Sequence, residues 1–246
     1  MNLLGFNFLS SVRQRIRSML AIVAISLLCL LCGGLTAFGF APAQAIQAYR
    51  ISRMPVTEDG AQVAAAEMGE ELLFTGVLRD NALLLNRFVA YAAEEWKVTM
   101  PSEDARGSSE PSGHWETAET VIPALTLDLN GQPVSLHGTD SAHLSGSLHT
   151  QMVKGDGPNQ AEYEGELLPD GTRRYRGLFD GDLVTVLGRK SANGGVLPEH
   201  LFGGDRLQFV ESQRQAASGL FMAGLCMMAF APLLLIGGLL WALLCK

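Results

Sequence analysis

The hydrophobic positions of this chain are concentrated at its two ends. Met19 to Phe40 is a run of 22 residues without a charged side chain, and Ala217 to Cys245 is a second uncharged run. A helix needs about 20 mainly apolar residues to cross a bilayer, so both runs are long enough. The pattern predicts two transmembrane helices, at residues 19–41 and 217–245.

Between these runs, short apolar segments alternate with turn-forming residues. "ELLFTGVL" at 71–78 and "GDLVTVLGRK" at 181–190 have the composition of strands, and the Asn-Gly pair at Asn130 suits a tight hairpin turn. Many short strands with glycine-marked turns are typical of a small antiparallel barrel or sandwich. We therefore expect a mainly β domain, OB-like in character, over residues 46–215, flanked by the two transmembrane α-helices.

Three finer expectations accompany this fold class. "EDGAQVAAAEMGEEL" at 58–72 predicts a helix before the first strand, and Pro101–Gly113 predicts an exposed loop because it is rich in turn formers and charge. "LFGGDRLQFVESQ" at 201–213 predicts a last strand that leads into the second span.

The charges indicate an orientation for the spans. Arg13, Arg15 and Arg17 are the only charged residues in the first 45, and they precede the first span. The positive-inside rule places residues 1–18 in the cytoplasm, the central domain outside it (periplasmic in a bacterium) and the C-terminus back inside. The alternative is a signal peptide cleaved after Ala45. A signal core is usually about 7–15 residues, shorter than this run, which favours an uncleaved anchor.

Charge and cysteine content exclude several function classes. Removing Arg13, Arg15, Arg17 and Lys246 from the formal −7 leaves −11 on residues 46–215. An acidic domain repels phosphate backbones, so no nucleic-acid partner is expected. All four cysteines, at positions 29, 32, 226 and 245, lie in the apolar ends, which leaves the central domain without a disulfide or a thiolate metal site. The expected partners are the lipid bilayer and a membrane protein or a second copy of the chain.

Three histidines lie close together in the sequence: His137, His143 and His149. Imidazoles can ligate a metal ion, and an even spacing of six residues puts all three on one face of a continuous strand. Residues six apart on a strand are nevertheless about 20 Å apart, so only turns could gather the rings. Two interpretations follow: a metal or ligand sensor outside the cytoplasm, or ordinary surface and turn histidines.

Paired carboxylates suggest no catalytic site. Glu94 and Glu95 are neighbours on a predicted strand and point oppositely, while Asp180 and Asp182 flank a glycine in a predicted turn. The serines lack the pattern of an activated nucleophile. We expect no enzymatic activity, no cofactor and no bound metal, and a hydrolase ranks last among the alternatives.

The sequence also resembles a known family. "TGVL", "FVAY", "VIPALTLDLNGQPV", "GDLVTVLGRK" and "FGGDRLQFVESQ" followed by an apolar helix resemble the GIDE domain, also called BAM, "beside a membrane". The resemblance covers about residues 20–245 and is sharpest over Gly181–Gln213. It implies a β module held between two membrane spans.

Family members that act as ubiquitin ligases carry a RING finger, which needs about eight Cys and His ligands. These 246 residues have no such ligand set, so ubiquitin-ligase activity is not expected from them. The sequence therefore predicts a non-enzymatic scaffold or modulator of a membrane or envelope complex, with the metal or ligand sensor as the alternative.

Overall fold

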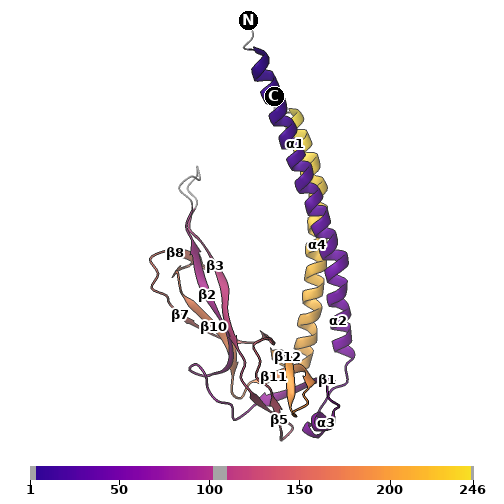
Figure 1. Ribbon diagram of the computed structural model, residues 1–246, viewed down its shortest axis with the longest axis vertical. Coiled ribbons are helices and arrows are strands. Elements are labelled where there is room, and N and C mark those ends of the chain that lie inside the picture. The colour runs from indigo at the N-terminus through magenta and orange to yellow at the C-terminus, as the bar shows by residue number, and fades with distance from the viewer. Residues whose placement is uncertain (1–3, 102–109, 245–246) are drawn as a thin grey trace. The chain divides into compact units, whose positions relative to one another are not determined.

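The computed structural model describes residues 4–101 and 110–244, arranged in two compact units. The helices up to Arg53, together with the C-terminal helix from Val210, form the helical unit, and Met54–Phe209 form the barrel unit (Figure 1). Most of the loop predicted at Pro101–Gly113 and the last residue of the second predicted span, Cys245, lie outside the described residues.

The helical segments are α1 (Leu4–Gly34), the π-helical η1 (Leu35–Phe40), α2 (Ala41–Arg53), α3 (Gly60–Ala65) and α4 (Arg206–Leu244). The strands are β1 (Glu71–Leu78), β2 (Phe88–Thr99), β3 (Ser112–Val121), β4 (Leu125–Leu129), β5 (Gln132–Leu136), β6 (His143–Gly146), β7 (His149–Val153), β8 (Gln160–Tyr163), β9 (Glu166–Pro169), β10 (Arg173–Phe179), β11 (Leu183–Lys190) and β12 (Val196–Gly203).

Five strands close into a barrel. Their order is β11-β1-β4-β5-β12, and a β11–β12 pairing completes the ring. All pairings in the ring are antiparallel except that between β5 and β12. In chain order the ring runs first, second, third, fifth, fourth, which is the connectivity of the OB barrel. The predicted fold class, mainly β with two flanking apolar helices, is confirmed.

The chain leaves the barrel twice, and the two insertions pair with each other. β2 and β3 are inserted between the first two barrel strands, and β6 to β10 between the third and fourth. β3, β2, β10 and β7 form a four-stranded antiparallel sheet, and β8 and β9 form a separate hairpin (Figure 1). The barrel core continues into the near end of this sheet through buried Val89, Ala90 and Leu178.

The β4–β5 hairpin follows its local sequence closely. Asn130 and Gly131 have φ of 52° and 85°, which is the backbone of a two-residue turn with two positive φ angles. The Asn130 side chain also donates to the Glu58 carbonyl at 2.6 Å. The predicted turn is therefore confirmed, and it is fastened to the segment before α3.

Two local predictions were wrong in extent. The helix predicted at 58–72 is only α3, begun by the Asp59 carboxylate, which accepts from the Ala61 amide at 2.8 Å. It ends at Ala65 because the next residue, Ala66, leaves the helical conformation with a ψ of 145°. Gly69, with a φ of 82°, then makes the turn that leads into β1. The segment predicted as a last strand, 201–213, is strand only to Gly203. Asp205 then caps α4 by accepting from the Gln208 amide at 2.8 Å.

Both chain connections of the barrel unit leave it at one place. Met54 is the first residue of the unit, and its carbonyl accepts from the Arg206 guanidinium at 3.0 Å. Arg206 is also the first residue of α4. The segments entering and leaving the barrel unit are therefore joined side by side.

Candidate functional site

The three predicted histidines have three separate sets of partners. His137 Nε2 lies 2.6 Å from the Gly194 carbonyl. His143, on β6, packs edge-on against His200 of β12 with ring centroids 5.7 Å apart. His149 Nε2 lies 3.1 Å from Asp182 Oδ1, and its ring stacks on Phe179. Over residues 4–101 and 110–244, no group of three or more His, Cys, Asp or Glu could hold a metal ion. The arrangement gives the sensor hypothesis no support.

The carboxylates considered as acid–base pairs each hold a structural contact. Glu94 accepts from Arg174 Nε at 2.7 Å, and Glu95 pairs with Lys97 on the same strand. The Asp180 carboxylate accepts from the backbone and side chain of Asn81, whereas Asp182 accepts from the Phe179 amide at 2.7 Å. A carboxylate engaged in this way stabilises a turn or a strand pair.

The inserted sheet has its own aromatic core. Trp96 and Trp115 face each other across β2 and β3 at 5.1 Å, and Tyr163 of β8 stands edge-on to both. The Arg174 guanidinium lies 4.3 Å from the Trp115 ring centroid and donates to the Tyr163 hydroxyl at 2.9 Å. A cage of this kind can hold a cation, but here the chain's own Arg174 occupies that position.

The helical unit is packed through small residues. Apart from Ile51 and Val210, the buried side chains and glycines described in it are Ser26, Gly33, Ala37, Ala41, Ala48, Ala217, Gly224 and Ala231. A Cβ on Gly33 would lie 2.8 Å from the Gly224 carbonyl oxygen, and one on Gly224 would lie 2.6 Å from the Ala37 amide nitrogen. The backbones of α1 and α4 therefore touch, as in membrane helix pairs.

The large apolar side chains of the helical unit point away from this contact. Leu27, Leu35 and Phe38 in the N-terminal segment, and Phe230 and Leu233 on α4, each expose more than half of their surface. Met19–Arg53 and Arg206–Gly238 are long and apolar enough to cross a membrane. A continuous exposed apolar surface of this kind requires lipid or protein around it. This is the arrangement of a two-span membrane protein.

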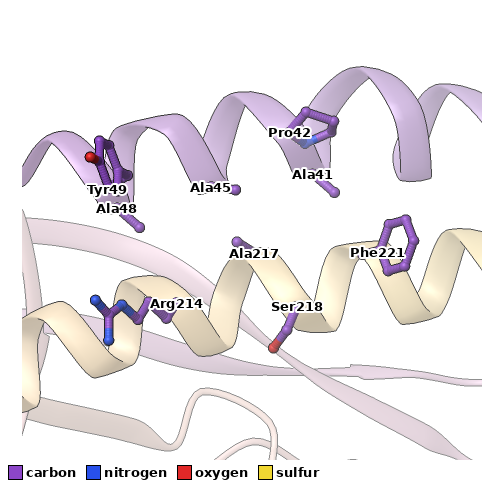
Figure 2. A pocket seen from close by; sticks show the side chains of 9 residues that line it. All are labelled: Ala41, Pro42, Ala45, Ala48, Tyr49, Arg214, Ala217, Ser218 and Phe221. Atoms are coloured by element: carbon purple, nitrogen blue, oxygen red, sulfur yellow. The ribbon is translucent and has the colours of Figure 1, made fainter.

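The same helix pair contains a groove of about 390 Å³. We call it the helix groove; it is lined by Ala41, Pro42, Ala45, Ala48, Tyr49, Arg214, Ala217, Ser218 and Phe221. Figure 2 shows Ala45, Ala48 and Ala217 facing each other across it, with Arg214 near Tyr49 at one end and Phe221 near Ala41 at the other. It is a mainly apolar trough with a cation at one end.

The sequence pattern gives little indication of the helix groove. The stretch that lines one wall, "APAQA" at 41–45, has the pattern of a signal-peptide cleavage site. In the structure these residues open α2, which follows η1 without a break, and Ala41 and Ala48 are buried. The only signal in the sequence was the spacing of small residues at 41, 45 and 48.

No protein-family model, curated protein or solved structure matches this chain.

Proposed function

We propose that this chain is a two-span membrane protein that holds its barrel unit outside the cytoplasm and serves as a non-enzymatic scaffold or modulator of a membrane complex. The single observation that supports it best is the helix pair: small residues packed between α1 and α4, and large apolar side chains turned outward. Such a pair is built to stay in a bilayer as a unit.

The orientation rests on the arginines before the first span. Arg13, Arg15 and Arg17 favour a cytoplasmic N-terminus. The second span then returns the chain to the cytoplasm, and the barrel unit lies on the opposite side, periplasmic in a bacterium. Retention of the first span is supported by the close contact of Gly33 and Ala37 with Gly224 of α4, which cleavage after Ala45 would remove.

Two features of the barrel unit support the scaffold role: the structural contacts of its candidate site residues, and its position in the chain between two spans. The histidines and carboxylates considered as candidate site residues hold structural contacts, such as those of His137, His149 and Glu94. A mainly β module between two spans is also what the resemblance to the GIDE domain implies. We therefore include in the proposal that residues 54–209 form a GIDE-like domain. Binding of another membrane protein is the function that fits such a tethered module.

Cysteine labelling tests the orientation. Every native cysteine lies in the apolar ends, so Asn193→Cys would be the one thiol of the barrel unit, at an exposed turn. A membrane-impermeant maleimide should label it in intact cells. Asn7→Cys, in the N-terminal segment, should react only after permeabilisation. The opposite labelling pattern would show that the orientation is wrong.

Photo-crosslinking tests the scaffold role. A photoreactive residue at Thr117, exposed on β3, should crosslink one recurrent membrane protein in native membranes. The same probe at Asn193 samples a different surface of the unit and serves as the comparison. Crosslinks to lipid or to the chain itself alone, at both positions, would refute a scaffold role.

A further inference from the structure

The helix groove differs from the rest of the helix-pair surface because it combines an apolar trough with an unpaired cation. Arg214 is the one charged residue in its lining, and it is exposed. Among the described residues the Arg214 guanidinium has no hydrogen-bond or ion-pair partner, and the Tyr49 hydroxyl near it has no hydrogen-bond partner. Arg53 adds a second cation, lying 5.4 Å from the Tyr49 ring centroid.

The groove lies at a defined depth along the spans. It begins at Ala41, directly after the apolar run Met19–Phe40, and extends to Tyr49. On α4, Arg214 lies three residues, or about 4.5 Å of helix, before the uncharged run that begins at Ala217, and Phe221 lies inside that run. The headgroup region on each side of a bilayer is roughly 5–8 Å thick beyond the hydrocarbon. The Phe221 end therefore meets acyl chains, and the Arg214 end lies among headgroups.

Charge distinguishes this region from the barrel unit. Residues 41–53 and 210–221 carry Arg50, Arg53 and Arg214 against Glu211, a balance of three minus one, or +2. The section 46–215 as a whole carries −11. A basic collar at the membrane surface attracts anionic lipid headgroups, by about 1 kcal/mol for each basic residue near the surface.

We propose that the helix groove binds one anionic phospholipid. Arg214 donates to the phosphate, since a guanidinium presents paired N–H donors that match two phosphate oxygens. The Tyr49 hydroxyl donates to the same headgroup. One acyl chain lies along the trough formed by Ala45, Ala48 and Ala217 and ends against the Phe221 ring. The volume of about 390 Å³ lies within the range of small-molecule sites.

The helix of a partner protein is the competing occupant, because small residues also accept a helix. The unpaired Arg214 favours the lipid, since a helix passing through the groove would bury this cation and would have to supply a carboxylate for it. The site rests on the proposed membrane insertion of the two helices. It does not depend on which side of the membrane the barrel unit occupies, so its failure and that of the orientation are separable.

Native mass spectrometry of the full-length protein tests the site. The protein is reconstituted in nanodiscs of phosphatidylcholine with about one tenth phosphatidylglycerol and then released. Wild type should retain one phosphatidylglycerol in preference to phosphatidylcholine. Arg214→Gln, which keeps most of the stem and removes the charge, should reduce this preference about tenfold, and Arg214→Lys should restore part of it.

Two further variants complete the design. Ala45→Leu fills the trough from an exposed helix position and should reduce retention of both lipids. Arg189→Gln removes another exposed arginine, which belongs to the barrel unit, and should change nothing. Unchanged phosphatidylglycerol retention in Arg214→Gln would overturn the proposal. So would a co-purifying protein that Ala45→Leu displaces and Arg214→Gln leaves bound, because the occupant would then be a helix.

Discussion

Replacing Arg174 with methionine should destabilise the barrel unit, whereas the same change at its neighbour Arg173 should not. The two residues are consecutive on β10 and therefore point to opposite faces of the inserted sheet. The Arg174 side chain is 16% exposed and is enclosed by Glu94, Trp115 and Tyr163. Arg173 is 55% exposed and reaches Glu95 only at 3.6 Å.

The magnitude follows from the contacts that Arg174→Met removes. A hydrogen bond between charged groups, such as the 2.7 Å contact to Glu94, contributes about 1.5–3 kcal/mol. The cation–π contact with Trp115 adds about 0.5–2 kcal/mol. Methionine keeps part of the apolar packing, so the free energy of unfolding should fall by about 2–4 kcal/mol.

The assay is chemical unfolding of the full-length protein in detergent micelles, followed by tryptophan fluorescence. Trp96 and Trp115 lie in the affected cluster, and a Trp241→Phe background removes the only other tryptophan. Arg173→Met should unfold at the same denaturant concentration as the parent protein, since an exposed, loosely paired arginine contributes little to stability. Equal losses in both variants, or an unchanged Arg174→Met, would refute the view that Arg174 holds this cluster together.

Three further predictions concern packing and pH. Gly113→Ala should red-shift the tryptophan emission, because a Cβ there would overlap the Trp96 indole; an unchanged spectrum would contradict this contact. Gly224→Ala should lower the melting temperature in detergent, and Gly219→Ala, which meets nothing within 4 Å, should not. Burial, and to a lesser extent His143, lowers the pKa of His200. The contribution of neutral His200 to the stability of the folded protein is therefore complete above about pH 6.5. It is lost as the pH falls through the lower pKa that His200 has in the folded state. Melting temperatures at pH 8 and pH 5 should differ less in H200F than in wild type.

Much of this structure could be predicted from local sequence. The segment 71–78 is β1 residue for residue, and Asn130-Gly131 makes the β4–β5 turn because glycine and asparagine accept positive φ at little cost. The two uncharged runs form long helices because their length and composition suffice. Each of these features depends only on neighbours in the sequence.

Local prediction failed where a capping residue or a distant contact decided the outcome. The run after Gly203 has the alternation of a strand, yet it is helical because Asp205 satisfies the free amide of Gln208 at the start of α4. The histidines at 137, 143 and 149 are close in sequence but find their partners at Gly194, His200 and Asp182.

The sequence by itself determined the apolar ends, the strand-rich middle and the hairpin turn, because periodicity and turn chemistry act over a few residues. Tertiary structure alone decided that β1 pairs with β11, more than 100 residues later, and closes the barrel. It also decided that the two insertions share one sheet and that Ala45, Ala217 and Arg214 border one groove. Such contacts depend on which distant surfaces bury each other most completely, and the local pattern of hydrophobic and polar residues does not predict this.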